Sequence, residues 1–178
     1  MNVMNAMNPM NAKRADHALA VPGNAATIDA CCFTVSGHRF AVRSSCVEEI
    51  LRGGTPTRVP LAPAEVGGVL HLRGRIVPVI DMARRLGLEA SAGAAIHVVI
   101  RSADEWYGLV VDDVLGVQSF PIDRIEPPGG ESVQDPRVGV FAGDGHLCHL
   151  LDPHRIVSTL FRQRTSPVIT HGASHVVA

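Results

Sequence analysis

Metal-binding side chains gather near the carboxyl end of the chain, in the run His146-Leu147-Cys148-His149. Alternate side chains of a strand point to opposite faces, so His146 and Cys148 would face one way and His149 the other. Three ligands then do not converge on one ion without a bulge, and the ligand spacings typical of zinc sites are missing. We interpret the run as structural. The alternative is a small-ligand or metal-responsive β-barrel built around His146, Cys148, His149 and His97.

Side chains that could catalyse a reaction are present, but their spacing is poor for catalysis. Glu48-Glu49 and Asp112-Asp113 are adjacent carboxylates. General acid-base catalysis needs two groups that converge on one cleft, whereas neighbours on an extended chain diverge. The sequence has no G-x-S-x-G nucleophile elbow and no glycine-rich loop with the lysine of a phosphate site. We therefore predict that the protein is not an enzyme and holds neither a cofactor nor a metal.

A charged pair in an apolar setting is the remaining candidate for function. Glu49 lies between Val47 and Ile50, and Arg73 lies at the tip of an expected hairpin. The neighbouring Gly74 is explained by the positive φ that a tight turn requires, but the arginine is not. The apolar residues could be core and the charges merely solvated. The other reading is an apolar groove shaped by a charged pair, which is how sites for docked peptides and helices are built.

The overall composition excludes several classes of protein. The 178 residues carry 16 basic and 17 acidic side chains, a net charge of −1, without the basic surplus of a nucleic-acid binder. The sequence contains no run of 18 apolar residues, so it does not predict insertion into a membrane. The amino end lacks the pattern of a secretion signal, and the four cysteines lack C-x-x-C spacing. These features predict a reduced, cytoplasmic protein.

Short apolar runs joined by turn signals dominate the chain after residue 30. Such runs at this spacing are typical of β-sandwiches and small barrels. Two short helices are expected, each beginning at an aspartate N-cap, Asp81 and Asp152. We expect strands at 31–35, 39–42, 70–72, 75–80, 96–101, 106–111, 138–142 and 146–151.

An internal repeat organises these elements. Four positions of one hairpin recur 71 residues later, and an upstream apolar pattern recurs 67 residues later. We infer two similar halves, about 30–90 and 95–163, each forming a small β-barrel. A barrel of about 60 residues has a marginal core, so the two are expected to pack together. At a spacing of 71, Gly68-Val69, Gly74 and Asp81 recur as Gly139-Val140, Gly145 and Asp152. At a spacing of 67, Phe40-Ala41-Val42, Val47 and Ile50 recur as Tyr107-Gly108-Leu109, Val114 and Val117.

Both ends of the chain are expected to lie outside this folded unit. Residues 1–29 contain a Met-Asn pair written four times and then small and polar residues, a low-complexity pattern that predicts a disordered leader. Residues 164–178 show no periodicity and are expected to be a flexible tail. One domain is therefore predicted, over 30–163.

The motifs together resemble a known family. The pattern F-x-V-x-G-x-x-F-A-V, then V-E-E-I, T-x-R-V-P-L-A-P and G-V-L-H-L-R-G-R-I-V-P-V-I-D resembles the CheW-like domain. The match continues through W-Y-G-L-V-V-D-D-V-L-G-V and G-V-x-x-G-D-G-H-L and covers about 31–160. The resemblance implies a mainly β fold of two interlocked, SH3-like, five-stranded barrels. Short helices would follow each barrel hairpin and lie near the carboxyl end.

The resemblance also implies a function. Members of this family are non-enzymatic adaptors of bacterial chemosensory signalling. They couple the cytoplasmic tips of methyl-accepting chemotaxis receptors to the regulatory domain of a CheA-type histidine kinase. The expected location is the cytoplasm, in association with chemoreceptor arrays at the inner membrane. Since the chain has no room for kinase or receiver domains, it resembles a stand-alone coupling protein.

Site residues follow from the matched motifs. The resemblance assigns Val47, Glu49, Ile50, Arg73 and Val98 to the groove that takes the receptor tip, with Glu49 and Arg73 paired. It makes Gly68, where a backbone can approach closely, a candidate for kinase binding.

Three residues depart from the family pattern and suggest a divergent paralogue. Arg43 stands where the family often has aspartate, and His71 and Leu61 stand where asparagine is common.

Overall fold

The computed structural model describes residues 26–90, 96–129, 132, 134–143 and 145–161. The expected tail at 164–178 and residues 1–25 of the expected leader lie outside the described residues. The first strand begins at Thr27, because backbone pairing with the strand at 113–121 extends to that residue. The expectation that the leader reaches residue 29 is therefore wrong at its boundary.

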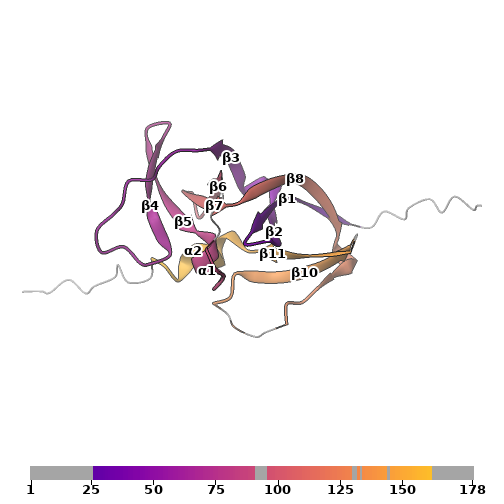
Figure 1. Ribbon diagram of the computed structural model, residues 1–178. Helices are drawn as coiled ribbons and strands as arrows, with labels where there is room; N and C mark the ends of the chain where they lie inside the picture. Colours follow the sequence, from indigo (N-terminus) through magenta and orange to yellow (C-terminus); the bar gives the residue numbers. More distant parts are fainter. Residues whose placement is uncertain (1–25, 91–95, 130–131, 133, 144, 162–178) are drawn as a thin grey trace, which may run out of the picture.

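Two sheets and a few short helices make up the described fold (Figure 1). The six-stranded sheet has the order β8 (Asp113–Pro121), β1 (Thr27–Val35), β2 (His38–Arg43), β11 (His146–Leu151), β10 (Arg137–Gly143), β9 (Ile125–Glu126). The five-stranded sheet has the order β3 (Val47–Arg52), β6 (Ile96–Ser102), β7 (Glu105–Val111), β5 (Arg75–Asp81), β4 (Val66–Leu72). The helices are η1 (Ser44–Cys46), α1 (Met82–Arg85), η2 (Ile122–Arg124) and α2 (Pro153–Ser158).

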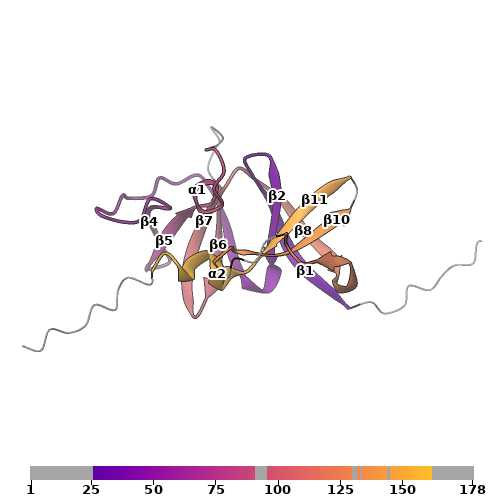
Figure 2. The ribbon, with the colours of Figure 1, turned by 90° about the horizontal axis from the view of Figure 1, so that it is seen from below.

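The sheets do not follow the two halves of the sequence. Strands β1 and β2 join β8 to β11, while β6 and β7 join β3 to β5. The mainly β fold is confirmed, but the expectation that each half forms its own barrel is wrong. Each half contributes strands to both sheets, which makes the two sheets one folding unit, seen side by side in Figure 2.

The sequence repeat is preserved in the pairing of strands. Parallel β5 and β7 pair Ile80 with Leu109, and parallel β11 and β2 pair Leu151 with Val42, which are the repeat-related positions. Strands β4 and β10 share the same burial pattern, and each has a register shift near its start. The repeat therefore describes a structural duplication.

The helix caps follow the same duplication. The side chain of Asp81 accepts a hydrogen bond from the backbone N–H of Arg84, and Asp152 does the same with Arg155. An aspartate at the N-cap satisfies a backbone donor that the first turn of a helix leaves unpaired. The predicted starts of both helices are confirmed.

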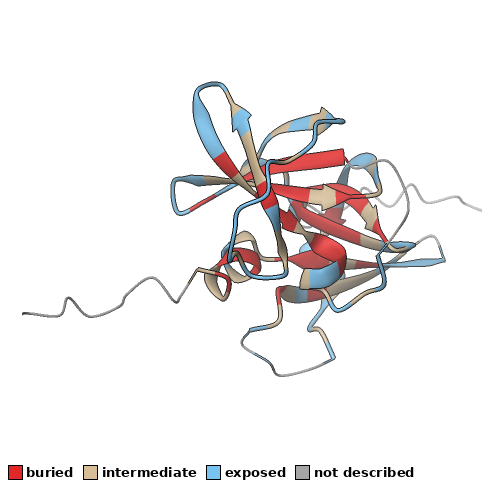
Figure 3. Ribbon diagram, turned by 60° about the vertical axis from the view of Figure 1, so that its left-hand side comes forward, coloured by how far each residue is buried: buried red, intermediate tan, exposed pale blue. Residues whose placement is uncertain are grey.

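The main apolar core lies between the two sheets, where buried residues concentrate in Figure 3. Phe33 and Val42 come from the six-stranded sheet, and Val98 and Leu109 from the five-stranded sheet. Ile156 of α2 packs in the same cluster. Because apolar burial contributes about 25 cal/mol per Å², this shared core holds the two sheets together. No helix among the residues described here is long and apolar enough to cross a membrane.

Arg85 fastens α1 to the other half of the molecule. Its guanidinium donates to the backbone carbonyls of Ile156 at 2.9 Å, Arg155 at 2.7 Å and Gln134 at 3.1 Å. Burial lowers the pKa of Arg85, partly offset by the nearby carboxylates of Glu65 and Asp135. The side chain thus joins three segments through one set of donors.

Replacing Arg85 by methionine is expected to lower the free energy of unfolding by about 2–4 kcal/mol, because three carbonyls lose charged donors in a partly buried site. Arg84→Met is the matched control. Its side chain is largely exposed, so a loss of about 1 kcal/mol or less is expected. Denaturant unfolding of both variants measures the difference, and equal losses would refute the role given to Arg85.

Candidate partner-binding site

A two-residue turn positions Arg73. Strands β4 and β5 are joined by Arg73 and Gly74, with Leu72 paired to Arg75 as the last pair of the ladder. The φ angles are 49° at Arg73 and 77° at Gly74, the left-handed values of a type I′ hairpin turn. This turn matches the right-handed twist of the strands and so fixes the direction in which the arginine leaves the hairpin.

Glu49 meets Arg73 across the five-stranded sheet. Arg73 Nη2 donates to Glu49 Oε2 at 2.5 Å, with the arginine side chain 68% exposed and the glutamate 17% exposed. The other oxygen, Glu49 Oε1, is buried and has no hydrogen-bond partner among the residues that the structure describes. The pair expected from the sequence is therefore formed, and its arginine is the member that remains accessible to another molecule.

The apolar residues beside Glu49 differ in exposure. Val47 packs partly against the main core, and Ile50 is 43% exposed. Ile50 pairs with Val98 in the register of β3 and β6, but Val98 is fully buried in the core. Val98 therefore supports β3 from within and has no surface to offer a partner, so its expected place in a groove is corrected. Val47, Glu49 and Ile50 lie close together on β3 with part of each side chain exposed, and Arg73 reaches Glu49 from the β4–β5 turn.

Strand β8 adds apolar surface that the motifs did not assign. Val114 packs partly against the same core as Val47, and β3 and β8 lie along the upper side of the molecule in Figure 1. Further along β8, Leu115 and Val117 are 40% and 64% exposed. The 67-residue repeat was the available signal, because it relates Val114 and Val117 to Val47 and Ile50.

Gly68 is buried beneath another segment of its own chain. Its φ is 140°, and a Cβ atom there would clash with the carbonyl oxygen of Thr57 and lie 3.1 Å from Pro56 Cβ. The close backbone approach expected at Gly68 is thus made by Thr57. Any influence of Gly68 on a partner must pass through the loop at 53–65.

Of the three departures from the family pattern, His71 precedes Arg73 by two residues on the same hairpin, whereas Leu61 and Arg43 lie on other segments. His71 is exposed on β4, and Leu61 is fully exposed with a φ of 58°. Arg43 ends β2, on the six-stranded sheet.

The residues of the metal-binding alternative do not come together. His97 is buried in the five-stranded sheet, whereas Cys148 lies in the small core of the six-stranded sheet. His149 packs its ring against Phe40 at 5.6 Å, and burial, then Arg137 and His38, lower its pKa. No cluster of three or more His, Cys, Asp or Glu side chains within the described ranges is arranged to hold a metal. The alternative is not supported.

The site is suited to recognition of another molecule. Charged groups that hold each other at the edge of exposed apolar side chains can fix the orientation of a docked helix or peptide. An ion pair of this exposure contributes only about 0–1 kcal/mol to stability, so its value lies in positioning.

Similarity to known proteins agrees with this fold and these motifs. The family model described as the CheW-like domain matches residues 29–161. Protein FrzA of Myxococcus xanthus is 34% identical over 139 residues, which are 75% of this chain and 86% of FrzA. The chemotaxis protein CheW of Rhizobium meliloti is 35% identical over 126 residues, 67% of this chain and 81% of that protein.

A solved structure has the same fold. The crystal structure of the scaffolding protein TtCheW from Thermoanaerobacter tengcongensis aligns with a TM-score of 0.68 at 22% identity. The alignment covers 74% of this chain and 92% of TtCheW. The family match spans nearly all of the described fold, and the resemblance expected from the motifs is confirmed. The chain belongs to the CheW-like domain family.

Proposed function

We propose that this protein is a non-enzymatic adaptor of chemosensory signalling, which couples methyl-accepting chemotaxis receptors to a CheA-type histidine kinase. Family membership supports this role, as do relatives named chemotaxis protein CheW and a structural neighbour named as a scaffolding protein. The proposed place of action is the cytoplasm, at receptor arrays of the inner membrane.

The observation that carries the proposal is the Glu49–Arg73 pair beside exposed apolar side chains. Most of the Arg73 side chain is exposed, and within the described part of the chain Glu49 Oε1 has no hydrogen-bond partner. A receptor helix could bury Ile50 and offer polar groups to both members of the pair. Apolar anchors that bury area, with charges that set register, are the usual elements of helix recognition.

The proposed receptor surface consists of Val47, Glu49, Ile50 and Arg73, with Leu115 and Val117 as its extension on β8. The proposed kinase surface is the loop at 53–65, whose exposed Val59 and Leu61 are held in place by contact with the strand that carries Gly68.

Co-sedimentation with receptor-containing membranes tests the adaptor role. Purified protein is mixed with these membranes, with and without a CheA-type kinase from the same cell. We expect the protein to sediment with the membranes and the kinase to sediment only when the protein is present. Membranes without receptors are the control. If neither partner sediments with the protein, the adaptor role is refuted while the fold stands.

A further inference from the structure

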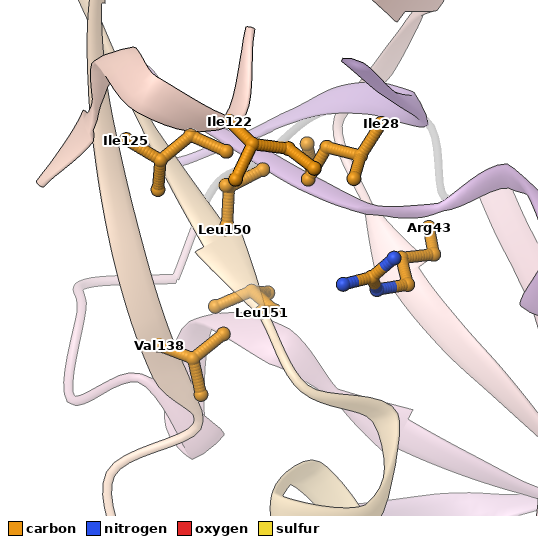
Figure 4. Close-up of a pocket in the computed structure, with 8 residues that line it drawn as sticks. Ile28, Arg43, Ile122, Ile125, Val138, Leu150 and Leu151 are labelled. Carbon is orange, nitrogen blue, oxygen red and sulfur yellow. The ribbon is translucent and has the colours of Figure 1, made fainter. Parts of the chain in front are cut away.

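A second feature of the molecule is a pocket in the six-stranded sheet, away from the Glu49–Arg73 pair. Its volume is about 280 Å³. Seven of the eight lining residues are apolar and come from strands β1, β2, β9, β10 and β11 and from η2. Figure 4 shows them as Ile28, Ala41, Ile122, Ile125, Val138, Leu150 and Leu151, with Arg43.

The pocket has an apolar floor and an accessible mouth. Ala41 and Leu150 belong to the small buried core of this sheet, with Ile28 and Ile125 packed against it. At the mouth, Ile122 is about half exposed. Apolar side chains left accessible around a hollow favour the burial of an apolar group from outside.

Arg43 supplies the only charge among the lining residues. It is exposed at the end of β2, and in Figure 4 its guanidinium extends toward the apolar side chains. No carboxylate in the described part of the chain forms an ion pair with it. A guanidinium is weakly hydrated and presents paired donors that match a carboxylate. The cation is thus free to bind an anion at the edge of the hollow.

We propose that this pocket binds an aliphatic carboxylate of medium chain length, with the tail among the isoleucine and leucine side chains and the carboxylate on Arg43. A hollow of about 280 Å³ is slightly smaller than the usual pockets for drug-sized ligands, which suits a short tail of about six to ten carbons. The feature is one hollow with one cation, not a row of anchors, so a small amphiphile fits it better than a peptide. This site is independent of the adaptor role.

Titration of the isotope-labelled full chain with octanoate, followed by NMR, tests the proposal. We expect a dissociation constant on the order of 1 mM or below, with the largest shifts at the amides of Ile28, Arg43 and Leu151. Acetate, which lacks the tail, and octylammonium, which reverses the charge, should bind at least tenfold more weakly. From butanoate to octanoate, each methylene should raise the affinity roughly fourfold.

Two variants separate the contributions of charge and tail. Arg43→Gln should weaken octanoate at least tenfold and leave 1-octanol unchanged, while Arg52→Gln, an exposed arginine on the other sheet, should change neither. Ile122→Ser should weaken octanoate and 1-octanol alike.

Three outcomes would overturn the proposal. They are the absence of octanoate binding, equal binding of octanoate and octylammonium, and shifts that map away from the pocket. Binding of an acidic peptide but not of octanoate would also overturn it, and would assign the pocket to a protein partner instead. The membranes, receptors and kinase play no part in this measurement, so its failure leaves the adaptor proposal untouched.

Discussion

Replacing Gly68 by alanine is expected to abolish kinase coupling and to destabilise the fold by about 1–3 kcal/mol. The φ of 140° is one that L-residues rarely adopt, and the added Cβ would clash with the carbonyl oxygen of Thr57. A backbone atom cannot move aside as the end of a flexible side chain can. The segment that contains Thr57 must therefore shift.

The shift would break the link between this loop and β4. Thr57 and Val69 exchange two backbone hydrogen bonds, each of 2.9 Å, and these bonds hold the loop on the sheet. The exposed Val59 and Leu61 lie on the same loop. If the loop is the kinase surface, its displacement removes kinase from the membrane pellet while receptor binding through Arg73 persists.

Gly67→Ala is the matched control for Gly68→Ala. The nearest atom to a Cβ at Gly67 is Val79 O at 3.8 Å, which is an ordinary contact. The Gly67→Ala variant should be as stable as the wild type, and the kinase should still sediment with the membranes when this variant is present. Denaturant unfolding and co-sedimentation measure the two effects. If Gly68→Ala unfolds early but still recruits the kinase at saturating protein, the loop is not the kinase surface.

Local sequence signals predicted eight of the eleven strands among the described residues, but not β3, β8 or β9. Gly74 and Gly145 have positive φ angles, and Asp81 and Asp152 cap helices. These features depend on a few neighbouring residues, so the types of those residues are sufficient to indicate them. The turn glycines and the capping aspartates are also equivalent positions of the 71-residue repeat, so the repeat is visible in both the sequence and the structure.

The assignment of strands to sheets could not be read from the same signals. Parallel pairing of β5 with β7 and of β11 with β2 joins residues that lie far apart in the chain. Apolar alternation tells which face of a strand is buried but not which strand lies beside it. The repeat therefore suggested two halves that each form a barrel and pack together, whereas each sheet of the structure contains strands from both halves.

The candidate site was predicted in part. Glu49 and Arg73 pair as expected, but Val98 proved to be a core residue whose side chain faces the other sheet. Both faces of β6 are buried, so its continuous apolar run carries no signal that distinguishes a surface valine from a core valine. The exposure of Leu115 and Val117 on β8 likewise depends on which strands lie beside β8, which the sequence pattern does not indicate.

Reversing the charge of Arg73 is expected to abolish receptor binding without unfolding the protein. In Arg73→Glu, two carboxylates would face each other at the edge of the proposed surface, and Glu49 would lose its only ion-pair partner among the described residues. Since the arginine is 68% exposed, the loss of stability should be about 1 kcal/mol or less. Co-sedimentation with receptor membranes should fall at least tenfold, which corresponds to about 1.4 kcal/mol of binding.

Arg101→Glu is the matched control, because Arg101 also pairs with a glutamate of β3, Glu48, at 2.8 Å. Glu48 lies at the register shift between Val47 and Glu49, and its partner Arg101 is on β6, not at the β4–β5 turn that carries Arg73. Reversal at Arg101 should leave receptor binding within about twofold of wild type. It controls for the general effect of adding negative charge to this sheet.

The double variant Glu49→Arg with Arg73→Glu distinguishes an ion pair that orients the surface from one that contacts the receptor. If the pair only fixes the shape of the surface, the exchange restores the attraction and receptor binding returns. If Arg73 or Glu49 Oε1 contacts the receptor, the exchanged charges face the wrong groups and binding stays lost. The large exposure of the Arg73 side chain, 68%, favours direct contact, so we expect no rescue. Wild-type sedimentation of Arg73→Glu itself would refute both roles, because neither allows a reversed charge at this turn.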